Sequence, residues 1–163
     1  YYNPDGSGSV DFRVYANKSM TLTAESNISK VEIAGYCKAV IDTIGSDHAP
    51  HLVSEKEGSY TKAPSGLPSI QQSLSVLLTV AYQEGIPLTR IASAFSEKAA
   101  DIYGLNRGKI LPGYEADLVI FDYSKEFTVK GEDQKSRCGW SPYEGETLRG
   151  VIENVIIDGK III

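Results

Sequence analysis

The residues best suited to chemistry in this sequence lie within one short segment. Asp47, His48 and His51 bring one carboxylate close to the chain's two histidines. A carboxylate can ligate a metal or accept a proton, and an imidazole can ligate, bind an anion or carry protons. A plainer reading makes Asp47 a turn residue before Pro50 and the histidines ordinary loop residues. Spacing alone leaves both readings open.

The residues before this cluster predict how it is positioned. Residues 39–45 are β-branched and mostly apolar, which is typical of a buried strand in a parallel sheet. Ligands of parallel α/β sheets and barrels bind at the carboxyl ends of the strands. The pattern therefore predicts an α/β fold in which a strand presents Asp47 at its carboxyl end.

Helical periodicity follows the cluster. Residues 52–67 are predicted to form a long loop, and Pro68 to open a helix that Gly85 ends. Two shorter helices are expected over 88–95 and 97–103. The apolar positions that define the first helix are Ile70, Leu74, Leu77, Leu78 and Ala81. The third helix takes Ser96 as its N-cap and Gly104 just past its end.

The pattern changes to β-structure after about residue 106. Asp158 and Gly159 form a strong two-residue hairpin signal, which leads into a last strand. The other predicted strands span residues 116–123, 127–130, 147–153 and 155–157. Residues 1–35 carry too little pattern to be assigned to a fold, although short strands are predicted over 10–15 and 20–23 and a short helix after Ser29.

Composition narrows the class of protein. The chain has 163 residues, 42% of them hydrophobic, which indicates a globular domain. Its formal charge is −5 and it has no run of Lys and Arg, so nucleic acid and membranes are not expected partners. Cys37 and Cys138 lie far apart, which favours a reducing cytoplasm over a disulfide framework.

Length adds a further expectation. A complete eight-stranded β/α barrel needs about 250 residues, so this chain is not such a barrel by itself. The first residue is Tyr1 rather than Met. We therefore expect either a processed product or a piece of a longer protein.

The motifs resemble those of dihydroorotases, which are cyclic amidohydrolases of the amidohydrolase superfamily. Residues 44–51, IGSDHAPH, resemble the last-strand signature, and residues 62–66, KAPSG, resemble the loop before the final barrel helix. Three later segments resemble the exit from the barrel, a tail motif and the closing hairpin: residues 105–122, 138–145 and 155–160. The resemblance covers residues 36–163, and its motifs occur in the family's order.

The resemblance implies a fold and an activity. Residues 36–106 would supply the last strand and closing helices of a metal-dependent-hydrolase barrel, and residues 107–163 a small β-sandwich tail. The activity implied is the zinc-dependent, reversible hydrolysis of dihydroorotate to N-carbamoyl-aspartate in pyrimidine biosynthesis. The segment SDHAPH favours dihydroorotase over hydantoinases and allantoinases, which usually vary the residues after the Asp-His pair.

The resemblance also implies roles for single residues. Asp47 matches the aspartate that ligates the more buried zinc and acts as general base, and His51 matches the histidine that contacts the substrate carboxylate. The backbone around Pro64 and Gly66 matches the segment that contacts the dihydropyrimidine ring. His48 has no matching role, and we interpret it as a packing residue.

The sequence departs from the family in its metal ligands. The family's binuclear zinc site needs a His-x-His pair, a carboxylated Lys and two further histidines. This chain has no His-x-His pair, and its only histidines are His48 and His51. Residues 16–22, including Asn17, match the family's substrate loop poorly. The chain alone is therefore predicted to lack a complete zinc site and to be inactive.

Two alternatives and several partners remain open. The chain is either part of an enzyme or a non-catalytic homologue that serves aspartate transcarbamoylase as a structural partner; a hydantoinase or allantoinase is the third reading. Apart from a small-molecule substrate, the expected partners are the rest of the barrel, a second copy in a homodimer, or aspartate transcarbamoylase.

Overall fold

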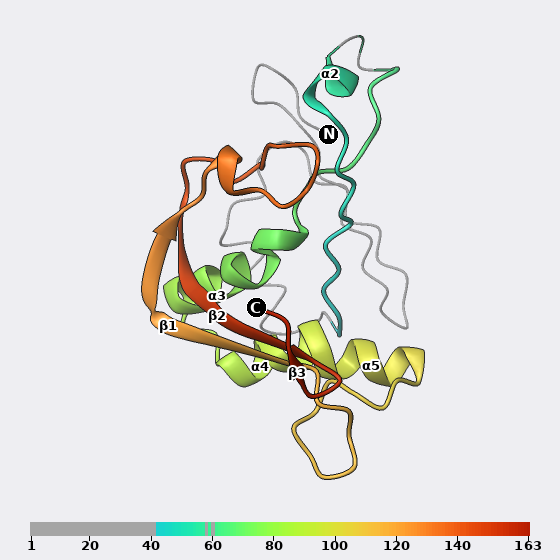
Figure 1. The fold of residues 1–163 in the computed structure, drawn as a ribbon, viewed down its shortest axis with the longest axis vertical. Coiled ribbons are helices and arrows are strands. Elements are labelled where there is room, and N and C mark those ends of the chain that lie inside the picture. The colour runs from blue at the N-terminus through green and yellow to red at the C-terminus, as the bar shows by residue number, and fades with distance from the viewer. Residues whose placement is uncertain (1–41, 58, 60) are drawn as a thin grey trace. The chain divides into compact units, whose positions relative to one another are not determined.

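A computed structural model of the chain describes residues 42–57, 59 and 61–163. These residues divide into two compact units. Figure 1 labels their helices and strands. The described part of unit 1 comprises residues 42–45, Val80–Asp122 and Ile152–Ile163, and unit 2 comprises Ser46–Thr79 and Tyr123–Val151. The elements predicted before residue 39, the substrate-loop segment 16–22 and Cys37 lie outside the described residues.

The strand predicted over 39–45 is wrong for its described part. Residues 42–45 form no strand. The Ile44 N–H donates to the carbonyl oxygen of Ala94, at 3.0 Å, and Ala94 lies in a helical segment. A strand requires a ladder of hydrogen bonds to a neighbouring strand, and no described residue supplies such a ladder to this segment.

The predicted loop over 52–67 contains one helical turn, α2 (Val53–Lys56). The following helix begins later than predicted. It opens with a 3₁₀ turn, η1 (Ile70–Gln72), and continues as α3 (Ser73–Glu84), so Pro68 precedes it. Gly85 follows with a φ of 63°, which confirms the predicted end.

The apolar face predicted for this helix is confirmed except at its start. Leu78 and Ala81 are each only 1% exposed, whereas Ile70 is 60% exposed. Ile70 lies in the 3₁₀ turn, which has three residues per turn, so it does not continue the apolar face of α3.

The two helices predicted after Gly85 form one continuous helical segment. It consists of α4 (Leu88–Ala92), a single π-helical turn η2 (Ser93–Glu97) and α5 (Lys98–Tyr103). The prediction of Ser96 as an N-cap is therefore wrong. The backbone at both junctions stays in the right-handed helical region. The wider π turn shifts the positions of the apolar residues without ending the helix. Gly104 ends the segment with a φ of 64°, as predicted.

Among the residues that the structure describes, three strands form a sheet in the order β1-β2-β3. They are β1 (Leu118–Thr128), β2 (Thr147–Ile157) and β3 (Lys160–Ile161), with a 3₁₀ turn η3 (Gly131–Asp133) between the first two. The predicted β-structure is confirmed, but the breaks predicted within β1 and β2 are wrong. Of the described strands, β1 lies at one edge of the sheet, where charged residues are readily accommodated.

The predicted hairpin is confirmed at Asp158 and Gly159. Both have a positive φ, 49° and 74°, as a type I′ turn requires. β2 and β3 pair antiparallel around this turn, with Ile157 opposite Lys160.

Each unit has its own buried residues. Those of unit 1 lie mainly on the helices and are Val80, Ala81, Ile86, Ile91, Ala94 and Ala100. The apolar ones of unit 2 are Leu77, Leu78, Val129, Cys138 and Leu148. Within the described residues, no helix is both long enough and apolar enough to cross a membrane.

In unit 2, α3 packs closely against β2 (Figure 1). The Ser75 hydroxyl donates to the carbonyl of Gly150 at 2.8 Å, and the Arg149 N–H donates to the Thr79 hydroxyl at 2.8 Å. A Cβ on Gly150 would lie 2.4 Å from Leu78 Cδ1. The absence of a side chain at this glycine therefore permits the contact between helix and strand.

Candidate functional site

Two segments of unit 2, residues 46–51 and 64–70, lie side by side, and we call them the site loops. A parallel bridge joins His48 to Leu67, and the Ala49 N–H donates to the Leu67 carbonyl at 2.9 Å. The Ser69 hydroxyl donates to the carbonyl of Ser46, also at 2.9 Å. The fold thus brings the segment that contains Asp47 and His51 against the segment that contains Pro64 and Gly66.

Gly66 is required by this close approach. Its φ is +89°, and a Cβ built on it would lie 2.3 Å from the Cβ of Ala49. Any larger residue would force the two site loops apart. The same position is 3.6 Å from the carbonyl oxygen of Asp47, so Gly66 and Asp47 are direct neighbours.

Asp47 is exposed and adopts a left-handed backbone conformation, with a φ of 45°. Aspartate is among the few non-glycine residues that tolerate this region. Among the described residues, none forms a hydrogen bond or ion pair with the Asp47 carboxylate. The loop therefore presents an accessible carboxylate that can accept a proton or bind a cation.

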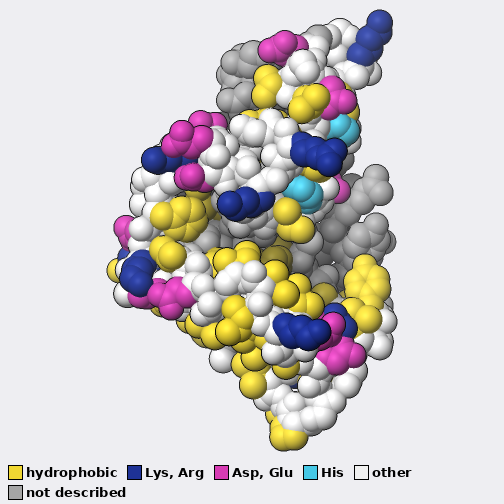
Figure 2. Space-filling view, in the orientation of Figure 1, with side chains coloured by type: hydrophobic (Ala, Val, Ile, Leu, Met, Phe, Trp, Pro, Cys, Tyr) yellow, Lys and Arg dark blue, Asp and Glu magenta, His cyan; other side chains and the backbone are white. Residues whose placement is uncertain are grey.

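The two histidines are held in different ways, and histidine side chains reach the surface drawn in Figure 2. His48 Nδ1 accepts a hydrogen bond from the Ile70 N–H at 3.2 Å. Because Nδ1 acts as an acceptor, the proton of the neutral imidazole is placed on Nε2. This contact links the two site loops and supports the interpretation of His48 as a packing residue.

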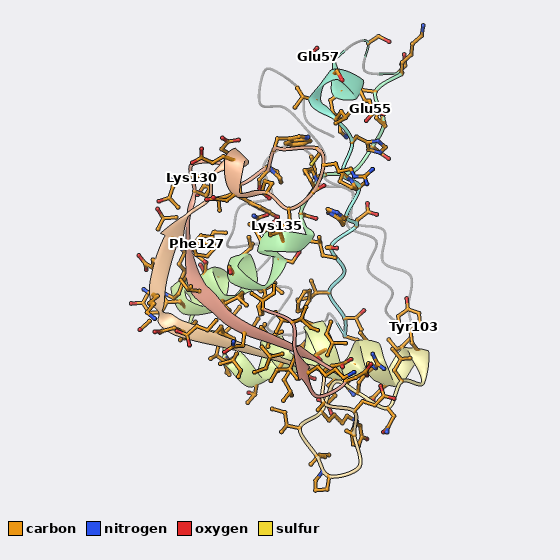
Figure 3. All side chains as sticks on the ribbon, viewed as in Figure 1. Glu55, Glu57, Tyr103, Phe127, Lys130 and Lys135 are labelled. Carbon is orange, nitrogen blue, oxygen red and sulfur yellow. The ribbon has the colours of Figure 1, made fainter. Side chains whose placement is uncertain are left out.

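His51 is held through its backbone. The Trp140 indole N–H donates to the His51 carbonyl at 2.9 Å. The His51 Nδ1 lies 3.8 Å from Oε2 of Glu55. Figure 3 labels Glu55 on α2. The Glu55 carboxylate also accepts a hydrogen bond from the N–H of Leu52, the N-cap residue of α2, at 2.6 Å.

From the sequence, Trp140 belonged only to the tail motif 138–145, and its contact with His51 was not predicted. An indole N–H that is partly buried needs an acceptor, and this need was the one available signal. The acceptor lies 89 residues away in the chain, however, so no local pattern could name it.

Lys56 is a second residue that the sequence reasoning missed. Its ammonium donates to the carbonyls of Pro64 and Gly66, at 2.6 and 2.5 Å. Desolvation lowers the pKa of Lys56 from its usual 10.5, and the nearby Glu55 charge partly offsets this effect. α2 is thereby attached to the second site loop.

The comparison with known families decides the family of the chain. The model of the Amidohydrolase family matches residues 13–162. The chain belongs to this family.

Relatives of this amidohydrolase chain include several proteins named dihydroorotase. The one from Streptococcus thermophilus is 38% identical over 151 residues, which are 90% of this chain and 35% of the relative. The one from Clostridium acetobutylicum is 35% identical over 134 residues, 82% of this chain and 32% of the relative. The chain thus spans about a third of the length of these relatives.

Similar solved structures include proteins named hydantoinase. The D-hydantoinase (dihydropyrimidinase) from Thermus sp. matches with a TM-score of 0.80 and 26% identity, over 86% of this chain and 32% of that one. The L-hydantoinase (dihydropyrimidinase) from Arthrobacter aurescens matches with a TM-score of 0.75 and 28% identity, over 81% and 31%. The amidohydrolase chain therefore shares its fold with a segment of larger proteins.

The described residues do not fit a complete zinc site. Zinc in proteins is held by three or four side-chain ligands. Within residues 42–57, 59 and 61–163, no group of three or more His, Cys, Asp or Glu side chains is arranged to hold a metal ion. Asp47 is the residue for which the family resemblance predicts a metal-ligand role in this amidohydrolase chain, and that role stays a prediction.

Unit 1 contains a shallow hollow of about 220 Å³. Arg107 at its edge forms ion pairs with Asp117, at 2.6 Å, and with Glu115. None of the predicted site residues lines the hollow. Its lining is formed by Phe95, Ser96, Ala99, Ala100, Tyr103, Leu105, Arg107, Gly108 and Asp117.

Proposed function

We propose that the chain is the C-terminal portion of a cyclic amidohydrolase that hydrolyses dihydroorotate, a step of pyrimidine biosynthesis. The observation that carries this proposal is the identity of 35–38% to proteins named dihydroorotase over more than four fifths of the chain. Structural neighbours named hydantoinase support the broader class, since hydantoins are also cyclic amides. In this proposal, residues 36–106 complete a β/α barrel and residues 107–163 belong to a β-sandwich.

Asp47 is the general base of the proposed reaction. Its carboxylate takes a proton from the attacking water while the water oxygen bonds to the ring carbonyl carbon. The carbon–nitrogen bond of the cyclic amide then breaks, and Asp47 returns the proton to the departing nitrogen. The accessible carboxylate on a backbone held by Ala49 and Leu67 supports this role.

The other predicted site residues bind the substrate. His51 donates a hydrogen bond to the carboxylate of dihydroorotate, and the backbone of Pro64 and Gly66 borders the ring. The bridge between the site loops supports this grouping, because it holds Gly66 next to Asp47.

The zinc that the family resemblance implies needs donors from outside the described residues. We propose that Asp47 contributes one ligand and that the rest of the barrel contributes the others. Coordination to zinc would make a bound water more acidic and a carbonyl more electrophilic.

The test compares the isolated 163 residues with an intact protein that also contains the rest of the barrel. We expect no stoichiometric zinc and no dihydroorotate turnover in the isolated chain, and both in the intact protein. The measurements are zinc content by elemental analysis and turnover in both directions. Metal-dependent activity of the isolated chain would show that a site exists among residues we have not named.

The substrate needs a separate measurement. On the intact protein, kcat/KM for dihydroorotate should exceed that for hydantoin, dihydrouracil and allantoin by at least about 100-fold. A preference for hydantoin would favour the activity named for the structural neighbours. An intact protein that binds no zinc and converts none of the four would support the non-catalytic reading.

A further inference from the structure

Lys56 is the last residue of α2, and its ammonium contacts the second site loop. The ammonium lies within hydrogen-bond distance of two carbonyl oxygens of the second site loop, 2.6 Å from that of Pro64 and 2.5 Å from that of Gly66. These acceptors are eight and ten residues further along the chain, so the contact closes a loop. Such bonds to a charged donor are stronger than those between neutral groups.

The two contacts determine how the backbone of this loop is oriented. A trans peptide is planar, and its C=O and N–H point in opposite directions. When Lys56 holds the Pro64 carbonyl toward α2, the Ser65 N–H points away from α2. Lys56 therefore selects which face of the loop backbone presents donors and which presents acceptors.

The desolvation of Lys56 indicates that the contact is costly. Burial lowers the pKa of this lysine, although the Glu55 carboxylate nearby acts in the opposite direction. A lysine on a flexible stem would avoid this cost by extending into water. Its attachment to two backbone carbonyls points to a positioning role.

Gly66 makes this role specific to the site. Its positive φ and its close approach to Ala49 place the segment that Lys56 contacts directly against the first site loop. The His48–Leu67 bridge holds the segment that contains Asp47, and this bridge does not involve Lys56. Lys56 therefore acts on the segment 64–66 more than on Asp47.

We propose that Lys56 is a positioning residue for substrate binding, whose ammonium orients the Pro64–Gly66 backbone that borders the substrate ring. This inference rests on the proposed function. It predicts that removal of the ammonium weakens substrate binding and leaves the chemical step nearly intact.

The test uses Lys56→Met and Lys56→Arg in the intact protein, with Lys62→Met as the control at an exposed lysine of the same loop. Lys56→Met should raise KM for dihydroorotate about tenfold and change kcat less than threefold, because it loses two hydrogen bonds to a charged group. Lys56→Arg should recover most of the affinity, since a guanidinium can also donate to two carbonyls. Lys62→Met should behave as the wild type.

A chemical variant covers the case in which Lys56→Met does not fold. Lys56→Cys is treated with 2-bromoethylamine, which restores an ammonium at nearly the original length, or with iodoacetamide, which does not. Wild-type protein treated in the same way reports the effect of modifying the other cysteines. The first treatment should restore KM and the second should not.

The outcomes separate this inference from the proposed function. If the wild-type protein converts no cyclic amide, the proposed function fails and the inference fails with it. If the wild type is active and the folded variants or both treated proteins share its KM, the inference alone is wrong. A tenfold loss in kcat with an unchanged KM would also contradict the inference, because such a result would place the effect of Lys56 on the chemical step.

Discussion

The site loops of unit 2 and the helical segment from α4 to α5 in unit 1 are stabilised in different ways. The site loops are held by hydrogen bonds to each other and by hydrogen bonds from other segments, such as those from Trp140 to His51 and from Lys56 to Gly66. The helical segment is held by buried apolar side chains, of which Ile91 and Ala94 are each 4% exposed.

Because of this difference, we expect substitutions in one region to change mainly activity and substitutions in the other to change mainly stability. Directional bonds fix the position of a few backbone atoms, whereas apolar burial contributes free energy in proportion to area. Substitutions in the site loops should therefore alter catalysis or substrate binding more than global stability. Substitutions in the helical segment should do the reverse, and four predictions test this contrast.

The largest effect is expected at Asp47. Asp47→Asn in the intact protein should lower kcat about 10²–10⁴-fold, because an amide cannot act as the general base. The melting temperature should stay near that of the wild type, since asparagine also tolerates a positive φ. Turnover and thermal melting are measured with Asp42→Asn, an exposed aspartate, as the control. Activity within tenfold of the wild type would remove Asp47 from the mechanism.

Ile91 tests the opposite side of the comparison. Ile91→Ala should lower the free energy of unfolding by about 2–5 kcal/mol through lost burial and a cavity. KM for dihydroorotate, measured well below the melting temperature, should not change. Ile102→Ala, at a residue that is 63% exposed, is the control and should cost little stability. If Ile91→Ala raised KM as much as a site-loop substitution does, the proposed difference between the two regions would be wrong.

A substitution at Gly66 should lower both the stability of the protein and its affinity for substrate. Gly66→Ala imposes a positive φ on alanine, at about 1–3 kcal/mol, and adds a clash with Ala49. Gly113→Ala has a similar φ of +90° but no atom within 4 Å, so it isolates the backbone cost. We expect Gly66→Ala to be the more destabilising change and to raise KM, as measured by urea unfolding and kinetics. Equal effects of the two substitutions would mean that the site loops separate without cost.

The smallest effect is expected at Trp140. Trp140→Phe keeps an aromatic ring but loses the N–H that donates to the His51 carbonyl. Loss of one hydrogen bond should cost about 0.5–1.5 kcal/mol of stability and raise KM a few-fold. Tyr103→Phe, at a residue that is 77% exposed (Figure 3), is the aromatic control. An unchanged KM would show that the indole contact does not orient His51.

The local sequence pattern was sufficient to predict structural features that depend on one type of interaction. The apolar spacing of α3 predicted the burial of Leu78 and Ala81, and Asp158-Gly159 predicted a hairpin turn. Both features depend on residues near in sequence. The pattern failed at Ser96, because a π turn keeps the helix continuous where the periodicity changes, and at 42–45, where strand formation depends on a partner.

For the candidate site, the order of motifs was sufficient to name the candidates but not their surroundings. Asp47, His51, Pro64 and Gly66 were all chosen from sequence, and their roles stay predictions. The structure adds that the two site loops are neighbours and that Gly66 is required by contact with Ala49.

The sequence by itself determined the α3 helix and the Asp158-Gly159 hairpin, because these depend on residue type and short spacing. It also named Asp47, His51, Pro64 and Gly66 as candidate site residues. Only the tertiary structure decided that Lys56 and Trp140 hold the site loops. Both act through side-chain donors on backbone carbonyls, and every residue carries such a carbonyl. A carbonyl acceptor leaves no mark in the sequence, so the fold alone determines which one each donor meets.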